Sequence, residues 1–178
     1  MNEDYSFVVD IQNEIIYFGL ENKLNDYIGV QKLVLSKLES ERFFGEVINE
    51  RTGTIIEINK KGIKETLGSG KRFQNLPRAL KELKIATIRM LPYILKNAYI
   101  SIDNVRNTHG DASKFAYFKL DMKINGVPVK VSIDVKRTSA KNKFWIHYIH
   151  ITKENSQLLS PGKNQAINEI ENLSKDSI

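Results

Sequence analysis

Apolar and polar residues alternate along residues 114–151, and this pattern predicts three antiparallel strands. Residues 115–124 and 127–136 flank Asn125-Gly126, a residue pair preferred in two-residue type I′ turns. Because such a turn fixes the register, every position in this first hairpin has a defined partner. The inner pairs are then all apolar: Ile124–Val127, Met122–Val129, Leu120–Val131, Phe118–Ile133 and Ala116–Val135.

The opposite face of this hairpin is polar, basic and aromatic. It is either an ordinary solvated surface, on which lysine and serine are common, or a functional one. Two large aromatic side chains, Tyr117 and Trp145, are expected on it, and exposed aromatic residues on a sheet usually pack on something. This favours the functional interpretation. The cross-strand pairs on this face are Asp121–Lys130, Lys119–Ser132 and Tyr117–Asp134.

The register of the third strand depends on the loop before it. If residues 138–141 form that loop, His147 faces Ser132, and the row continues to Lys119 on the first strand. These three side chains then lie side by side, with Cβ atoms about 4.5–5.5 Å apart per pair. A cation, a hydroxyl and an imidazole together can serve metal-free phosphodiester chemistry. The same register gives the pairs Val135–Phe144, Asp134–Trp145 and Ile133–Ile146.

The rest of the chain contains both helical and extended patterns. Leucine and isoleucine recur near helical spacing in residues 6–40, where Gly19 and Gly29 are expected to break the helix. Pro92 is expected either to open a second helix within the helical stretch 76–96 or to kink the first. The other expected elements are a hairpin at 45–59, a short helix or turn at 60–67, a strand at 99–105 and a C-terminal helix at 165–173.

These elements predict an α+β fold, in which N-terminal helices precede a curved antiparallel sheet with helices packed on one face. The helical stretch 76–96 is expected to cover the apolar face and to leave the lysine-rich face open. We divide the chain into an N-terminal helical segment, 1–42, a sheet-bearing domain, 43–152, and a C-terminal loop and helix, 153–178. The N-terminal segment is either part of the core or a separate docking segment.

Composition narrows the function only slightly. The 178 residues carry a net charge of +6 and have a pI of about 9.4, which suits an anionic partner, either nucleic acid or a membrane surface. The lack of cysteine excludes disulfides, thiolate zinc sites and a cysteine nucleophile. No apolar run reaches the ~18 residues of a transmembrane span, and the N-terminus lacks the pattern of a signal peptide. We therefore expect no membrane contact.

Metal-dependent and nucleotide-dependent chemistry has little support in the sequence. His147 and His150 are three residues apart, so on a regular strand they point to opposite faces and cannot share a metal. Carboxylates do not cluster as an acidic metal site requires. Gly68-Ser69-Gly70-Lys71 is rich in glycine but lacks the spacing of a phosphate-binding loop. We expect no metal and no small-molecule cofactor.

Metal-free cleavage of RNA needs a general base, a general acid and cations, because RNA supplies its own 2′-hydroxyl nucleophile. Histidine suits the acid–base role near neutral pH, and His147 is the first candidate. His109, in a polar link, is the second candidate, whereas His150 is expected to be buried toward the helices. The supporting residues are Lys119, Lys130, Lys136 and Ser132, with Tyr117 and Trp145 as stacking platforms.

Two segments carry a resemblance to a known group of nucleases. Residues 53–100 contain a strand, a short Gly62-Ile63-Lys64 segment and two helices, and residues 127–151 end in Lys143-Phe144-Trp145-Ile146-His147. Over about residues 43–152 this arrangement resembles the phage and mobile-element branch of the barnase–EndoU–colicin–RelE-like nuclease superfamily. The resemblance implies a metal-independent ribonuclease of the kind found in polymorphic toxins and contact-dependent inhibition systems, neutralised by an immunity protein.

The resemblance also adds candidate site residues. Residues 61–66 match the segment that delivers polar side chains to the open face of the sheet. Lys64 and Thr66 thereby become catalytic candidates, and Arg72 becomes a candidate substrate contact. The closing strand supports His147. Many relatives place a histidine near Glu65, and this chain does not.

Our first hypothesis is a metal-independent endoribonuclease, a toxin domain that cleaves tRNA or another structured RNA by attack of the 2′-hydroxyl. Its partners would be that RNA and a cognate immunity protein. We expect a bacterial or phage origin, with action in the cytoplasm, as part of a larger secreted protein that is delivered there. The alternative is a non-catalytic module of a phage or mobile-element protein that binds nucleic acid or an acidic protein. The missing histidine near Glu65 favours this alternative.

Overall fold

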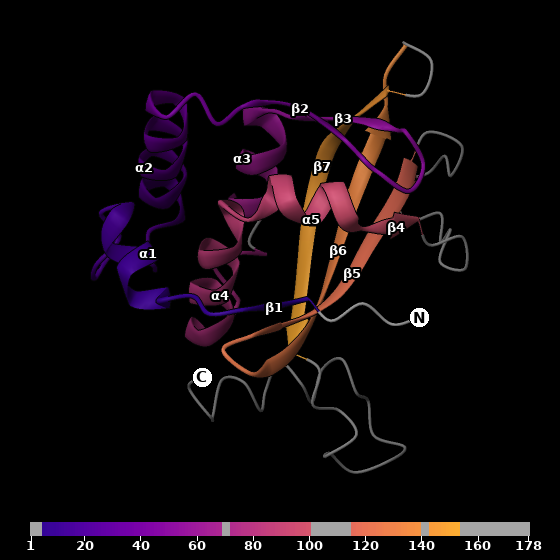
Figure 1. Cartoon of the computed structure of the whole chain (residues 1–178). Helices are drawn as coiled ribbons and strands as arrows, with labels where there is room; N and C mark the ends of the chain where they lie inside the picture. The colour runs from indigo at the N-terminus through magenta and orange to yellow at the C-terminus, as the bar shows by residue number, and fades with distance from the viewer. Residues whose placement is uncertain (1–4, 69–71, 101–114, 140–142, 154–178) are drawn as a thin grey trace.

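A strongly curved sheet forms the centre of the computed structural model of the chain (Figure 1). Its three long strands are β5 (Phe115–Ile124), β6 (Val127–Arg137) and β7 (Lys143–Lys153). Helices pack against this sheet, so the predicted α+β class with a curved sheet is confirmed. The structure describes residues 5–68, 72–100, 115–139 and 143–153.

Four shorter strands complete the described sheet. They are β1 (Ser6–Phe7), β2 (Gly45–Ile48), β3 (Ile55–Ile58) and β4 (Tyr99–Ile100). The strand order is β1-β5-β6-β7-β3-β2, and β4 pairs with β5 beside this path. The predicted hairpin at 45–59 is confirmed as β2 and β3, and β3 lies parallel to β7. β1 lies parallel to β5. The sequence analysis predicted neither parallel pairing.

The β5–β6 hairpin has the register predicted from its turn. Asn125 and Gly126 both have positive φ, 54° and 78°, as a type I′ turn requires. The five apolar inner pairs and the three outer pairs all occur as predicted. Asn125 also holds the N-terminal segment, since its side chain accepts a hydrogen bond from Val9 N–H at 2.8 Å and donates one to the Val9 carbonyl.

The predicted register between β6 and β7 is wrong. Near the loop, Val135 pairs with Ile146, whereas further along the strand Asp134 pairs with Tyr148. His147 is therefore the extra residue of a β-bulge, and the predicted pair Ser132–His147 does not form. The predicted pairs Val135–Phe144, Asp134–Trp145 and Ile133–Ile146 are shifted as well.

Burial explains why β7 has a bulge at this position. Phe144 and Ile146 are both buried, and so are Ile149 and Ile151, with exposed fractions of at most 7%. In a regular strand the first two residues would face one side and the last two the other, because side chains alternate. One inserted residue between the pairs places all four on the inner face. His147 occupies that position.

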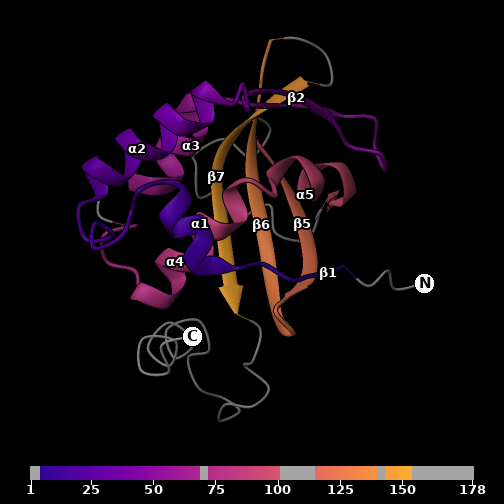
Figure 2. The ribbon, with the colours of Figure 1, turned by 60° about the vertical axis from the view of Figure 1, so that its left-hand side comes forward.

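Five helices are described: α3, α4 and α5 lie against the sheet, whereas α1 packs on α4 and α2 on α3. In two views α5 crosses in front of the long strands, with α3 and α4 beside β7 (Figures 1 and 2). The predicted buried side chains of the stretch 76–96 are confirmed, since Leu80, Leu91 and Ile94 are at most 2% exposed. The helices are α1 (Ile11–Tyr17), α2 (Tyr27–Ser40), α3 (Lys60–Gly68), α4 (Arg78–Ile88) and α5 (Leu91–Asn97).

The helix boundaries follow local chemistry with one exception. Gly19, with φ 71°, follows α1, and Pro92 lies in the first turn of α5, as predicted. The predicted break at Gly29 is wrong, because this residue lies inside α2. There its N–H donates to the Asp26 carboxylate at 3.1 Å, so Asp26 caps the helix just before Gly29.

The N-terminal segment shares the hydrophobic core with the sheet. Leu20, Val30, Val34 and Leu38 are fully buried in the same cluster as the inner face of the strands. Other predictions fall outside the described residues: the C-terminal helix at 165–173, His109, and most of the strand at 99–105. Among the helices that the structure describes, none has the length and apolar character needed to cross a membrane.

Candidate functional site

A row of polar side chains crosses the outer face of the sheet. Lys119 on β5 pairs with Ser132 on β6, as predicted, and Ser132 pairs with His150 on β7. On the other side of Lys119, Tyr99 of β4 extends the row. A cation, a hydroxyl and an imidazole thus lie on three neighbouring strands, but the imidazole is that of His150 and not that of His147.

His150 is bonded to a buried carboxylate. Its Nε2 atom lies 3.1 Å from Oδ2 of Asp134, which is 5% exposed, whereas the His150 side chain is 46% exposed. The prediction that His150 is buried toward the helices is therefore wrong, because the bulge reverses the facing of every residue after His147. A carboxylate bonded to one ring nitrogen orients the imidazole.

The Tyr148 ring is the centre of the site. The Lys84 amine lies 4.1 Å from the ring centroid, the Arg72 guanidinium 4.8 Å and the His150 ring 4.6 Å. Lys84 Nζ is also 2.8 Å from the Tyr148 hydroxyl. Lys84 comes from α4, which lies beside β7 in Figure 1, and it is only 3% exposed. Two cations and an imidazole therefore surround one phenol ring.

Burial shifts the proton affinity of this cluster. Burial, together with the nearby positive charge of Arg72, lowers the pKa of Lys84 to about 7. Burial also raises the pKa of Tyr148, although the charge of Arg72 and its hydrogen bond to the phenol act in the opposite direction. A lysine that titrates near neutral pH beside an imidazole is typical of functional sites.

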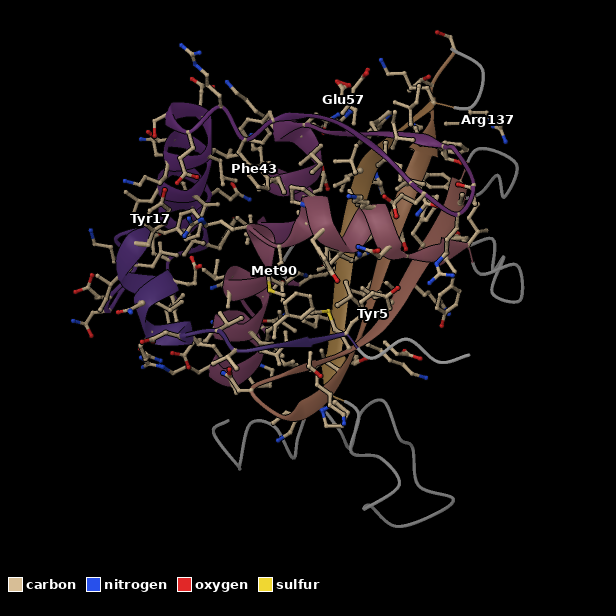
Figure 3. The ribbon with its side chains drawn as sticks, in the orientation of Figure 1. Tyr5, Tyr17, Phe43, Glu57, Met90 and Arg137 are labelled. Carbon is tan, nitrogen blue, oxygen red and sulfur yellow. The ribbon has the colours of Figure 1, made fainter. Side chains whose placement is uncertain are left out.

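Three of the predicted residues gather at the end of the sheet where β3 joins β7. His147 contacts the rings of Phe115 and Trp145, at centroid distances of 5.3 and 5.7 Å. Trp145 is half-buried between the Lys61 and Lys136 amines, 5.3 and 5.7 Å from its ring. Figure 3 shows Glu57 and Arg137 at this end of the sheet. These residues lie one row or more away from the His150 row.

Tyr117 and Lys130 lie on the outer face as predicted, but in different environments. Tyr117 pairs with Asp134 and is only 7% exposed, so it is not the open stacking platform that the sequence analysis predicted. Lys130 is exposed and pairs with Asp121 on one side and Thr152 on the other. The outer face is therefore partly covered around Asp134 and open toward the β5–β6 turn.

The α3 residues that the resemblance suggested divide into two groups. Thr66 is fully buried, and its hydroxyl accepts a hydrogen bond from Ile149 N–H at 3.1 Å. It therefore binds the edge of β7, and its predicted place on the open face is wrong. Lys64 is exposed on α3, and its carbonyl accepts a hydrogen bond from Gln31. Neither residue belongs to the row formed by Lys119, Ser132 and His150.

Sequence reasoning missed four members of the site: Asp134, Tyr148, His150 and Lys84. A signal for the first three was present, because the order of apolar residues in 144–151 changes phase at His147-Tyr148. Nothing in the sequence separates Lys84 from the other lysines of its helix. In the part of the chain that the structure describes, no group of three or more His, Cys, Asp or Glu residues could hold a metal ion.

Comparison with protein families gives one match. The model of the large polyvalent protein-associated domain 3 matches residues 30–148, about two thirds of the chain, which include most of the sheet and α3 to α5. No curated protein and no solved structure matches. The matched domain associates the chain with phages and mobile elements, and so with a bacterial or phage origin. The chain belongs to the large polyvalent protein-associated domain 3 family.

Proposed function

We propose that this protein is a metal-independent endoribonuclease whose catalytic histidine is His150. The observation that carries the proposal is the position of His150, which is bonded to buried Asp134 and lies in one row with Ser132 and Lys119. The imidazole is half exposed, so a substrate can reach it, while its carboxylate partner is shielded from water. This combination is what a general base needs.

The reaction uses this row, the RNA itself and a proton from solvent. His150 takes the proton of the 2′-hydroxyl, whose oxygen then forms a bond to phosphorus. The bond from phosphorus to the 5′-oxygen breaks, and the leaving oxygen takes up a proton from solvent. Lys119 lies two strands from His150 and stabilises the negative charge that develops on the phosphate oxygens. Ser132, between them, donates a hydrogen bond to the same oxygens.

The family membership supports the proposed setting. An association with phages and mobile elements agrees with a toxin domain that acts on the RNA of a bacterial cell, with tRNA as our proposed substrate. The arrangement of strands and helices agrees with the resemblance to metal-independent nucleases described above. A cognate immunity protein is then the expected protein partner, and the cytoplasm of the target cell is the expected place of action.

Cleavage of total tRNA by the purified protein, followed on a denaturing gel in the presence of EDTA, tests this proposal. We expect discrete fragments with EDTA present, at least ~10²-fold slower cleavage by H150Q, and a smaller loss in D134N. H147Q is the matched control, since it changes a histidine of the same strand outside the row, and it should retain activity within about threefold.

Three outcomes would contradict the proposal. Equal cleavage by H150Q and the wild type would remove the role of His150, and a loss confined to H147Q would return that role to the bulge residue. Loss of activity with EDTA would indicate a metal enzyme. Intact RNA, recovered after salt-sensitive binding, would identify the alternative function, a module that binds nucleic acid without cleaving it.

A further inference from the structure

Arg72 lies at the site with no carboxylate partner among the described residues. Its guanidinium lies over the Tyr148 ring, 4.8 Å from the ring centroid. Among the residues that the structure describes, Arg72 forms no ion pair with an acidic residue. The residue is exposed, so the side of its guanidinium that faces away from the ring is accessible to a ligand.

The groups beneath Arg72 add positive charge instead of balancing it. Lys84 contacts the same ring and is almost fully buried. Burying an ammonium group next to a guanidinium is unfavourable, because desolvation and repulsion act together. An anion bound to Arg72 would offset part of the guanidinium's charge and would make the protonated form of Lys84 less costly.

The position of this cluster identifies the anion. Arg72 and His150 lie 4.8 and 4.6 Å from the centre of the Tyr148 ring. Both groups therefore contact the same aromatic ring, which places Arg72 near the proposed base. Guanidinium groups bind phosphate oxygens in a two-pronged geometry, and every nucleotide of RNA carries a phosphate.

We propose that Arg72, held on Tyr148 with Lys84 behind it, is a phosphate-binding subsite for the RNA backbone, and that phosphate binding increases the protonation of Lys84. The subsite rests on the proposed function for its ligand, and it goes further because it assigns the phosphate contact and couples it to a buried proton. By linkage, a bound phosphate that favours protonated Lys84 must itself bind more tightly when Lys84 is protonated.

Other charged groups near Lys84 face different partners. Lys81, one turn earlier in α4, donates to the Asn25 side chain at 3.1 Å. Glu82 accepts a hydrogen bond from Gln12 and faces α1. The groups that face Lys84 directly or through the Tyr148 ring are Arg72, Tyr148, His150 and Asp134. Of these, His150 is also ionisable, so the test must keep it unchanged in every variant that is compared.

Calorimetry with the full chain and a short 2′-O-methylated RNA tests the subsite, because this RNA lacks the 2′-hydroxyl and cannot be cleaved. We expect R72Q to bind roughly tenfold more weakly than the wild type, through loss of a charge-assisted contact. R78Q is the matched control, since Arg78 is an exposed arginine at the start of α4. It should bind within about twofold of the wild type.

The coupling between phosphate binding and protonation of Lys84 is measured as proton uptake. Calorimetric titration at pH 7 in buffers of different ionisation enthalpy gives the number of protons taken up when the RNA binds. Wild-type protein should take up more protons on binding than K84M, with a difference of up to roughly half a proton, because a group at its pKa is half protonated. K32M, which changes an exposed lysine of α2, should match the wild type. His150 is intact in all three proteins, so its protons cancel in the comparison. If K84M does not fold, Y148F replaces it. This variant keeps the ring but removes the hydroxyl that contacts Lys84, and it should take up fewer protons on binding than the wild type.

The outcomes separate this inference from the proposed function. Wild-type affinity in R72Q, or no measurable binding by the wild type, would overturn the subsite. Wild-type proton uptake in K84M, or in Y148F if it replaces K84M, would overturn the coupling. If natural RNA is not cleaved but the Arg72 and Lys84 effects are present, the nuclease proposal fails and the subsite stands. If RNA is cleaved and R72Q binds like R78Q, the nuclease proposal stands and the subsite fails.

Discussion

The two long hairpins of the sheet differ in what determines their register. In β5–β6 a two-residue turn with two positive φ angles sets every pair, and the strands are regular along their length. In β6–β7 the pairing shifts by one residue between Asp134 and Val135. The first hairpin is therefore determined by local stereochemistry, and the second by what packs against it.

Helix α3 holds β7 on both sides of the bulge. Gly62 lies so close to the carbonyl oxygen of Ile146 that an added Cβ would collide with it. On the other side of His147, Thr66 accepts the hydrogen bond of Ile149 N–H. Beyond Trp145, no described strand pairs with this edge of β7, and a helix binds it instead. The bulge that brings His150 to Asp134 lies between the two contacts. Four changes test this contrast.

Gly62→Ala should have the largest effect. The new methyl group meets the Ile146 backbone, which cannot move without disturbing the ladder of β7. We expect a loss of roughly 3 kcal/mol or more in the free energy of unfolding, measured by urea denaturation. Lys61→Ala, an exposed neighbour in the same helix, should lose less than about 0.5 kcal/mol. Equal stability of the two variants would show that α3 does not hold the strand.

Lys84→Met should change the pH dependence of stability. The pKa of Lys84 is about 7 in the folded chain and 10.5 ordinarily, so between these values the unfolded chain binds more protons. Stability therefore rises with pH in this window, by about 2 kcal/mol from pH 7 to pH 9, and below pH 7 the full cost of the buried charge is present. The variant should lack this rise in urea denaturation at each pH, whereas Lys32→Met should keep it. A rise of the same size in Lys84→Met would contradict the burial of a charged amine beside Tyr148.

Thr66→Val removes the hydroxyl and keeps the shape of the side chain. The Ile149 N–H then has no acceptor at a buried strand edge, and we expect a loss of about 1.5 kcal/mol. Hydrogen exchange should show faster exchange at Ile149, with little change in β5. Thr152→Val, on the exposed part of β7, serves as the comparison. Unchanged protection of Ile149 would mean that α3 contributes only through Gly62.

Gly126→Ala tests the regular hairpin and should have the smallest effect. Gly126 has φ 78°, and an added Cβ meets no atom within 4 Å, so the cost is only that of a left-handed backbone, roughly 1 kcal/mol. Thermal unfolding measures this loss, and RNA cleavage should remain within about twofold of the wild type. A large loss of cleavage would indicate that the turn, and not α3, positions the His150 row.

The sequence predicted those features that depend on near neighbours. The type I′ turn, the apolar pairs of the β5–β6 hairpin and the buried side of the stretch 76–96 follow from stereochemistry and periodicity, and all are confirmed. The pair Lys119–Ser132 follows from the same register. The α+β class follows from the order of these elements. None of these features depends on where a distant segment docks.

Tertiary structure alone decided which histidine completes the site. A shift of one residue in β7 exchanges the faces of His147 and His150, and the choice depends on burying Ile149 and Ile151 with the rest of the core. The same packing brings Lys84 from α4 to Tyr148 and leaves Arg72 over the ring. Such contacts join segments more than sixty residues apart, so no periodicity within one segment records them. Their physical cause is the gain from burying apolar side chains, which is large enough to interrupt the regular pairing of a strand.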